Sequence, residues 1–453
     1  MGRSPTEGWL FSWPEPRTGA SGLKRIINGK GGAGLGSLDG VRILDLSRVL
    51  AGPFATMILA DLGADVVKIE PPHGDETRAW GPPFWGELSA YFLTVNRNKR
   101  SLVLDLKDAE ARAVFLEMVQ KADVVVENFK PGTMQRFGLD YAVLERHNPR
   151  LIYAAISGFG QNGPYAKLPG YDFIIQAMGG MMAVTGEPDG APMKVGAAIA
   201  DLAAGFYAAI GILAALRERD QSGRGQFIDI SLFDAEVALL ANTALNYLVS
   251  GERPKRYGNA HPNIVPYQVF QAQDGPFVVA VGNDRQFQTL CQVIGAPELA
   301  LDARFATNAD RLAHREALIA RLSAVFAARP VREWVERLRA AGVPVGAIWS
   351  HDVLFDDPHV AAREMKRTIR HPELGDVPQL GSPLKLSRTP VEFRLAPPRL
   401  GEGAQEALLS YGIDPSRLAG QGNGRAYDGA VQHEGFARRT GTTEPEGAIP
   451  PEH

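Results

Sequence analysis

The sequence predicts an α/β protein whose main sheet is parallel and is covered by helices on both faces. From about residue 41 to residue 158, short apolar runs alternate with longer segments of helical periodicity. These runs are apolar throughout and do not alternate with polar residues, which is typical of strands buried on both faces. Short buried strands that alternate with helices indicate a Rossmann-like parallel sheet.

Five strands and two helices are expected in this part of the chain. The helix over 52–63 has Pro53 near its start, where a missing N–H group is tolerated. The helix over 108–122 begins at Asp108, a favourable N-cap. The strands are expected at 41–46, 64–70, 101–106, 123–128 and 150–158.

A long apolar segment, "VGAAIADLAAGFYAAIGILAAL" over 195–216, contains a single acid, Asp201. We expect a buried helix entered near this residue, because the acid, the glycines and the many alanines make a poor membrane span. Two roles for Asp201 stay open. As an N-cap, its carboxylate would accept backbone N–H bonds worth about 1 kcal/mol. As a nucleophile, it would lie at a helix N-terminus among small residues that leave room for a substrate.

The chain is expected to divide into a large domain made from two separate segments and a smaller α/β domain between them. The middle of the chain contains a strand at 276–282 and a helix at 285–295, and "VPVGAIWS" over 343–350 is expected to be a strand that returns to the large domain. The predicted segments are a loose leader (1–37), the first part of the large domain (38–225), the small domain (226–342), the return segment (343–420) and a tail without apolar periodicity (421–453).

Composition excludes several classes of function. A net charge of −3 argues against a general nucleic-acid-binding protein. The single cysteine, Cys291, excludes an intramolecular disulfide and is expected to be a small buried apolar residue. No metal-binding spacing of histidines occurs, so no metal site is expected. The start of the chain has no apolar run of the kind that marks a secretory signal, which favours a cytoplasmic protein, or a mitochondrial one in a eukaryote.

Polar and basic residues recur where predicted strands end. Lys107 follows the strand at 101–106, and Asn128, Lys130 and Arg136 follow the strand at 123–128. In parallel α/β sheets ligands bind outside the carboxyl ends of the strands, so these side chains are suited to a phosphate group. An ordinary solvated surface explains the residues alone equally well.

Six segments, in order, resemble the class III CoA-transferases, the family of formyl-CoA transferase and carnitine CoA-transferase. The resemblance spans about residues 38–420. The segments are "LDGVRILDLSRVLAGPFATMILADLGADVVKIEPPHGDETRAW", "NRNKRSLVLDLK", "ADVVVENFKPGTMQRFGLDY", "NPRLIYAAISGFGQNGPY", "AAIADLAAGFYAAIGILAAL" and "SGRGQFIDISLFDAE". The resemblance implies a two-domain subunit whose ring-like chain interlocks with a second copy in a homodimer. It implies no permanently bound cofactor, with a coenzyme A thioester as substrate.

The resemblance places the family's nucleophilic aspartate on Asp201, in the context x-A-D-x-x-x-G. Its carboxylate would attack an acyl-CoA to give an acyl-aspartyl anhydride and then an aspartyl-CoA thioester, which an acceptor acid consumes. Apolar surroundings would activate a weak nucleophile and protect both intermediates from water. The other family positions are Leu104, Asp105, Lys107, Asn128, Phe129, Lys130 and Arg136 for CoA, and Tyr171, Asp172, Val49 and Leu50 beside the reacting groups.

Several positions depart from formyl-CoA transferase. Leu50 replaces a glutamine, Asp172 a glutamate, and Pro71 an arginine that contacts CoA. The stretch "GNAHPNIVPYQVF" over 258–270 has no glycine run where that enzyme has a tetraglycine loop. It resembles the succinate–hydroxymethylglutarate CoA-transferase branch instead, which implies dicarboxylate substrates with oxalate the poorest acceptor. Asn259 and His261 would then line the acyl pocket.

A distal carboxylate needs a cationic partner, and Arg48 is the candidate, with a surface ion pair as the alternative role. Two other functions stay open. α-Methylacyl-CoA racemases share the fold and use a histidine where this chain has Tyr171, and a tyrosine is a poor base near neutral pH. A non-catalytic CoA-binding protein would bind CoA without turnover.

Overall fold

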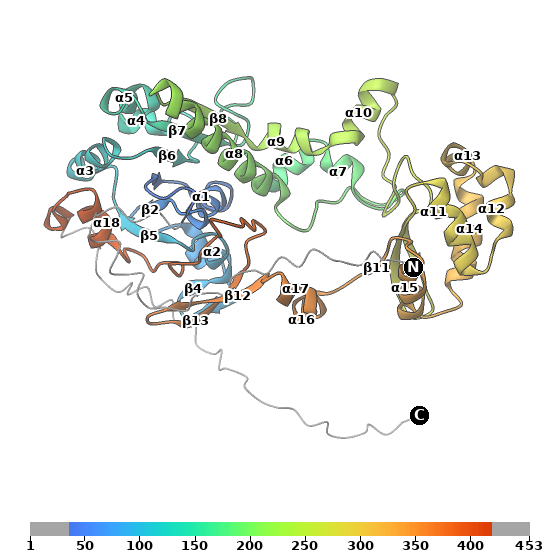
Figure 1. Ribbon diagram of the computed structural model, residues 1–453. Coiled ribbons are helices and arrows are strands. Elements are labelled where there is room, and N and C mark those ends of the chain that lie inside the picture. Colours follow the sequence, from blue (N-terminus) through green and yellow to red (C-terminus); the bar gives the residue numbers. More distant parts are fainter. Residues whose placement is uncertain (1–35, 419–453) are drawn as a thin grey trace, which may run out of the picture. The chain divides into compact units, whose positions relative to one another are not determined.

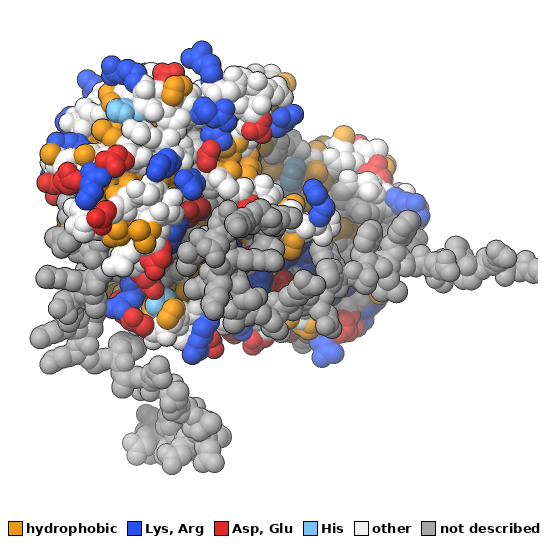
Figure 2. All heavy atoms as spheres, turned by 60° about the vertical axis from the view of Figure 1, so that its left-hand side comes forward, with side chains coloured by type: hydrophobic (Ala, Val, Ile, Leu, Met, Phe, Trp, Pro, Cys, Tyr) orange, Lys and Arg blue, Asp and Glu red, His pale blue; other side chains and the backbone are white. Residues whose placement is uncertain are grey.

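A computed structural model describes residues 36–418 (Figure 1). The predicted tail and nearly all of the predicted leader lie outside the described residues. On the face drawn in Figure 2, Lys and Arg side chains are interspersed with Asp and Glu side chains.

The largest sheet has six parallel strands in the order β5-β2-β1-β6-β7-β8. In order of their appearance along the chain this is 3-2-1-4-5-6, the order of a doubly wound Rossmann sheet. The prediction of a parallel α/β sheet is therefore confirmed. The direction of winding reverses between β1 and β6, which is where such sheets bind ligands. The strands are β1 (Arg42–Asp45), β2 (Asp65–Glu70), β5 (Lys99–Val103), β6 (Val124–Glu127), β7 (Ile152–Ser157) and β8 (Phe227–Ser231).

Helices cover both faces of this sheet, which explains why its central strands are apolar throughout. In β1, Ile43 packs with the helices α1 (Ala51–Asp61) and α8 (Ile199–Ser222) on one face. The next residue, Leu44, packs on the other face with α3 (Ala109–Val119) and α18 (Ala404–Ser410). Asp108 caps α3 as predicted, because its side chain accepts a hydrogen bond from the N–H of Ala111.

The strand predicted at 101–106 is instead Lys99–Val103, so it begins earlier and ends earlier. The charged pair Lys99 and Arg100 hid its start. Lys99 is buried in the sheet by an ion pair with Asp45, which the sequence pattern does not reveal.

The smaller sheets correct two predicted boundaries. β11 (Val345–Ala347) pairs antiparallel with β10 (Pro276–Ala280), which also pairs with β9 (Tyr267–Gln271). The strand expected to return to the large domain therefore belongs to the three-stranded sheet β11-β10-β9. β8 pairs with β7 in the large sheet, so the boundary predicted at 225/226 is also wrong. Both strands are short and apolar, and periodicity alone does not say which sheet a short strand joins.

The core of the three-stranded sheet contains Cys291, which is fully buried as predicted. Its elements are β9 (Tyr267–Gln271), α11 (Asp284–Ile294), α12 (Glu298–Leu301), η2 (Ala303–Phe305), α13 (Asn308–Ala313), α14 (Arg315–Phe326) and α15 (Val331–Ala340). The remaining elements are η1 (Glu76–Ala79), β3 (Phe84–Trp85), β4 (Leu88–Ser89), α2 (Ala90–Val95), α4 (Thr133–Phe137), α5 (Tyr141–His147), α6 (Asp172–Met178), α7 (Met181–Val184), α9 (Leu232–Leu239), α10 (Ala241–Ser250), α16 (His351–Asp356), α17 (Pro358–Ala362), β12 (Lys366–His371), β13 (Gly375–Leu380) and η3 (Pro415–Leu418).

The last part of the described chain packs against the large sheet. The backbone N–H of Asn98 donates to the carbonyl of Leu395 (2.8 Å), and that of Ser101 donates to the carbonyl of Glu402 (2.8 Å). Side chains of α18 are buried in the same core as β5.

The apolar helix α8 is long and apolar enough to span a membrane by length and composition. Half of its most apolar window is nevertheless buried inside the protein, and core helices of soluble proteins meet the same criterion. It packs against α1, α9, β7 and β8.

Candidate active site

The loops that follow β1 and β6 are joined side by side at the switch point. The backbone N–H of Arg48 donates to the Asn128 side-chain oxygen (2.8 Å), and the Asn128 amide nitrogen donates to the carbonyl of Arg48 (2.7 Å). The Arg48 guanidinium lies over the Phe129 ring, 5.6 Å from its centroid. Two of the predicted groups of site residues therefore meet where a doubly wound sheet binds ligands.

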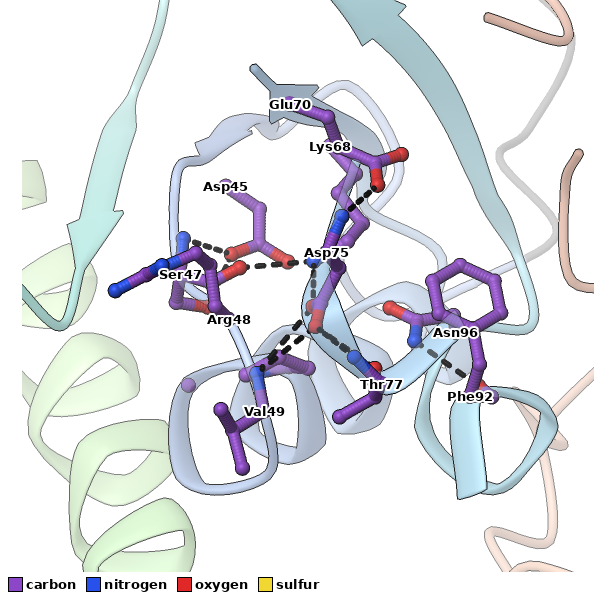
Figure 3. Close-up of polar contacts among 12 residues, drawn as sticks. Asp45, Ser47, Arg48, Val49, Lys68, Glu70, Asp75, Thr77, Phe92 and Asn96 are labelled. Carbon is purple, nitrogen blue, oxygen red and sulfur yellow. Dashed lines mark hydrogen bonds and ion pairs between the residues drawn. The ribbon is translucent and has the colours of Figure 1, made fainter. Parts of the chain in front are cut away.

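A buried cluster of charges holds the loop after β1 in place (Figure 3). Lys68 Nζ pairs with Asp75 (2.9 Å) and donates to the carbonyl of Ser47 (2.8 Å). Lys99 Nζ pairs with Asp45 (3.0 Å), whose carboxylate also accepts from the N–H of Ser47. Burial alone raises the pKa of Asp75, but Lys68 and the Thr77 hydrogen bonds outweigh it and lower the pKa to about 2. The acid is therefore ionised at neutral pH and paired.

Val49 is held in a strained backbone conformation at the end of this loop. Its φ is 67°, in the left-handed region that a β-branched residue rarely adopts. Its N–H faces the Asp75 carboxylate at 3.3–3.4 Å, and the next residue, Leu50, is the N-cap of α1. Strain of this kind persists only where the surroundings impose it, and it gathers at functional sites.

Asp201 lies in the first turn of α8, but it is not the N-cap. The cap is Ala198, whose side chain cannot accept a hydrogen bond, so the cap role considered for Asp201 is wrong. Instead, Asp172 of α6 caps the start of α8. Its Oδ1 accepts from the N–H groups of Ala200 (2.9 Å) and Asp201 (3.4 Å), and this leaves the Asp201 carboxylate outside the capping interaction.

The surroundings of Asp201 bring the pKa of its carboxyl group close to neutral pH. Burial and the charge of Asp172 raise its pKa to about 7. Tyr91 of α2 lies close enough that Asp201, Asp172 and Asp75 add to burial in raising the tyrosine pKa to about 12. Tyr91 therefore keeps its hydroxyl proton at neutral pH.

Gly205, one helical turn after Asp201, allows α1 to approach α8. An added Cβ there would lie 2.8 Å from the carbonyl oxygen of Ala51 and 2.9 Å from the Phe54 ring. The rings of Phe54 and Phe206 pack edge to face, with 5.1 Å between their centroids. Because Ala51 is the first residue of α1, this close packing sets the start of α1 against the turn of α8 that follows Asp201. It gives a physical reason for the spacing D-x-x-x-G.

Substituting Gly205 with Ala is expected to destabilise the protein by about 1–3 kcal/mol through overpacking, despite the better helix propensity of alanine. The matched control is Gly211→Ala in the same helix, where an added Cβ would be 3.4 Å from the Ile228 side chain, close to ordinary contact distance. That variant is expected to be neutral or slightly stabilising. Denaturant unfolding of both variants measures the difference, and equal stabilities would contradict the packing argument.

Among residues 36–418, no group of three or more His, Cys, Asp or Glu residues is arranged to hold a metal ion.

Comparison with known proteins decides the family. Residues 38–404 match the family described as CoA-transferase family III. The chain belongs to this family. It is similar to the acetyl-CoA:oxalate CoA-transferase of Acetobacter aceti (49% identical over 354 residues, covering 78% of this chain and 90% of the relative). It is also similar to the succinate–glutarate CoA-transferase of Agrobacterium fabrum (46% over 378 residues, 82% and 94%). A solved structure of a CAIB/BAIF family protein from Brucella suis superposes with a TM-score of 0.74 at 46% identity, covering 83% of this chain and 99% of that one.

The predicted family of this class III CoA-transferase is thus confirmed, and so is its enzymatic class: it transfers CoA between acyl-CoA thioesters and carboxylic acids. The predicted CoA positions lie in the segments that follow β5 and β6, with Arg136 in α4. Leu104 is buried directly after β5, whereas Lys107, Lys130 and Arg136 are exposed. The Arg136 guanidinium donates to the Thr133 hydroxyl (2.9 Å).

Among residues 36–418, no hydrogen bond connects Asp201 to the predicted acyl-pocket residues Arg48, Asn259 and His261. Arg48 pairs with Glu76 (2.9 Å) at the half-exposed surface, which is the alternative role considered for it. Asn259 is exposed, and His261 lies in the loop before β9, where its N–H donates to the carbonyl of Tyr267 (2.9 Å). Tyr171 is the N-cap of α6 and is 65% exposed.

Two residues near the nucleophile position of the transferase escaped the sequence analysis. Gln176 is fully buried, donates to Asp172 (2.8 Å), and accepts from the N–H of Val195 (2.8 Å), so it ties α6 to the entry of α8. Tyr91 belongs to a short helix without a motif. The i, i+4 spacing of Asp172 and Gln176 was the available signal, since such residues share a helix face.

Proposed function

We propose that the enzyme transfers CoA from succinyl-CoA to a dicarboxylic acid such as glutarate or hydroxymethylglutarate, with Asp201 as the nucleophile. The observation that carries this proposal is the half-buried Asp201 carboxyl group in the first turn of α8, with its pKa raised to about 7 and no cation paired with it among the described residues. Relatives named for succinate–glutarate and succinyl-CoA:mesaconate transfer support the dicarboxylate class.

The reaction balances as two exchanges on one carboxylate. An Asp201 oxygen attacks the thioester carbonyl, the C–S bond breaks, and CoA thiolate and an acyl-aspartyl anhydride form. The thiolate then attacks the aspartyl carbonyl and releases the donor acid, which leaves an aspartyl-CoA thioester. An acceptor carboxylate attacks that thioester to form a new anhydride, and the thiolate then attacks the new acyl carbonyl, giving acyl-CoA and free Asp201.

The surroundings of Asp201 support each half of this sequence. Burial desolvates the carboxylate and makes it more reactive than in water. Asp172 occupies the N–H groups of Ala200 and Asp201 and orients the first turn of α8. Positioning of this kind, together with binding of the distant nucleotide, helps to offset the cost of the anhydride.

The intermediate can be trapped. After incubation with succinyl-CoA and hydroxylamine, peptide mass spectrometry is expected to find a hydroxamate on Asp201 and none on Asp172. Turnover with an unmodified Asp201 would contradict the mechanism. Deuterium uptake at the α-carbon of a 2-methylacyl-CoA without CoA exchange would instead support the racemase alternative, and CoA binding without any turnover would support the non-catalytic one.

The acceptor is the finer question. The relative from Acetobacter aceti is named for oxalate, so oxalate is the second candidate acceptor. Initial rates with glutarate, hydroxymethylglutarate, itaconate, malate and oxalate separate the two. We expect the longer diacids to have the higher kcat/KM, and a clear preference for oxalate would reverse the assignment.

We also propose that the enzyme works as an interlocked homodimer. All residues of α10 are at least partly exposed, and they include Leu245, Leu248 (71% exposed) and Val249 (84% exposed). An apolar surface of this kind marks an interaction site. Sedimentation equilibrium is expected to give a dimer mass, and a monomer that retains turnover would exclude this part of the proposal.

A further inference from the structure

The loop before β9 is held by an arginine whose charge is not balanced by any acid of the described residues. Arg315 is the first residue of α14, and no carboxylate of the described residues lies within 4.0 Å of its guanidinium nitrogens. Two other arginines, Arg48 and Arg219, also have a buried guanidinium nitrogen without a hydrogen-bond partner, but both are paired with an acid. Arg315 is therefore the described arginine that combines a buried, unpartnered nitrogen with an uncompensated charge.

The geometry around Arg315 leaves one nitrogen available. Its Nη2 donates to the backbone carbonyls of His261 (2.8 Å) and Pro262 (3.0 Å), and its guanidinium lies 5.6 Å from the centroid of the Tyr257 ring. Nη1 is buried and has no partner. The guanidinium is thus fixed in place on one side while the other side can still donate. Leaving a buried donor unpaired is costly, so a ligand acceptor is expected there.

The position of Arg315 does not serve the stability of the helix. A cation in the first turn opposes the helix dipole, which favours anions at that end. Burial lowers the pKa of Arg315, and together with Arg315 it lowers the pKa of the nearby His261. Each of these effects is relieved when an anion binds.

The loop is tied to the segment that leads to Asp201. The N–H of Gly258 donates to the carbonyl of Gly186 (3.1 Å), and the Arg256 guanidinium donates to the carbonyl of Gly190 (2.7 Å). The chain then runs from 190 directly into α8. Hydrogen bonds therefore connect the loop that Arg315 contacts to the segment that precedes α8.

We propose that Arg315, fixed by the carbonyls of His261 and Pro262, binds the distal carboxylate of the dicarboxylic acyl group. This inference rests on the proposed function, and it assigns to Arg315 the role considered above for Arg48. A guanidinium suits this carboxylate, because its planar fork of N–H donors matches the two carboxylate oxygens.

The test compares two donors that differ only in the distal group, glutaryl-CoA and valeryl-CoA. In a ping-pong reaction, kcat/KM for the donor reports its own half-reaction. Arg315→Gln is expected to lower kcat/KM about 10- to 100-fold for glutaryl-CoA and less than about 3-fold for valeryl-CoA. Arg315→Lys, which keeps the charge but not the fork, is expected to fall between Arg315→Gln and the wild type. Arg321→Gln, on the exposed part of the same helix, is the matched control and is expected to change neither value.

Equal losses for both donors would overturn the proposal and point to a phosphate of CoA as the anion. No loss for either would overturn it as well. If Arg315→Gln does not fold, the glutaryl/valeryl ratio of Arg315→Lys carries the test. If the wild type turns over neither donor, the proposed function fails, and calorimetric titration of the two thioesters still decides the site. Tighter binding of glutaryl-CoA that depends on Arg315 supports the site, and equal binding excludes it.

Discussion

Replacing Asp201 with Asn is expected to lower turnover by at least about 10⁴-fold, because the amide cannot form the anhydride. The loss should fall on kcat, with acyl-CoA still bound. The same substitution should make the protein more stable near pH 8. The pKa of Asp201 is raised from 3.8 to about 7, so its contribution to stability is complete below about pH 4 and is lost as the pH rises through about 7. A shift of that size corresponds to at most about 4 kcal/mol.

Denaturant unfolding and steady-state kinetics at pH 8 measure both effects on the same sample. An inactive variant that is also more stable separates loss of chemistry from loss of structure. The control is Asp234→Asn. Asp234 is an acid in the first turn of another helix, α9, and its backbone N–H donates to the Ser231 hydroxyl oxygen. The variant is expected to keep its activity. A variant Asp201→Asn with more than a few per cent of wild-type turnover would exclude a nucleophilic role.

The pH profile of the wild type offers an independent check. Because Asp201 must be ionised to attack, kcat is expected to fall tenfold per unit below about pH 7. Asp172→Asn removes one of the two causes of the raised pKa while keeping an oxygen that accepts from Ala200. The acid limb should therefore move to lower pH. A limb that stays in place would mean that another group controls it.

Most of the large sheet could be predicted from the sequence because its strands are buried on both faces and therefore read as apolar runs. The pattern failed at Lys99, where a charge is buried by Asp45 from a strand more than fifty residues earlier. It also failed at Val345–Ala347, since pairing partners are set by tertiary packing that a three-residue strand does not encode. The local sequence pattern thus predicts most strands of the large sheet, whereas the sheet that a short strand joins depends on contacts between distant parts of the chain.

The candidate site shows the same division. Asp201 stands out in the sequence as a lone acid among small apolar residues, and the family motif assigns it. Its environment does not stand out. The helix is capped by Asp172, which is 28 residues before Ala200, and Tyr91 reaches the site from a helix more than a hundred residues earlier. The sequence left two roles open for Arg48, and its ion pair with Glu76, 28 residues later, could not be read from the local pattern.

Removing the buried charge of Lys68, in β2 beside the loop after β1, should destabilise the protein strongly. Lys68→Met leaves Asp75 buried without its ion-pair partner and deprives the carbonyl of Ser47 of its donor. Breaking one side of a buried pair costs about 3–5 kcal/mol, because the remaining charge stays uncompensated. The pKa of Asp75, now about 2, should rise. Denaturant unfolding at pH 7 measures the loss, and NMR titration of the carboxyl measures the shift.

The matched control is Lys366→Met. Lys366 pairs with Asp356 at 3.7 Å with side chains 62% and 84% exposed, so the same substitution should cost less than about 1 kcal/mol. The double variant Lys68→Met/Asp75→Asn removes both charges, and the amide oxygen can still accept from the N–H of Val49 and Thr77. It should therefore be more stable than Lys68→Met alone. The alternative outcome is a loss of unfolding free energy in the double variant that equals the sum of the losses in Lys68→Met and Asp75→Asn. The two side chains would then not be coupled. Contacts other than this ion pair would have to hold Val49 in its strained conformation.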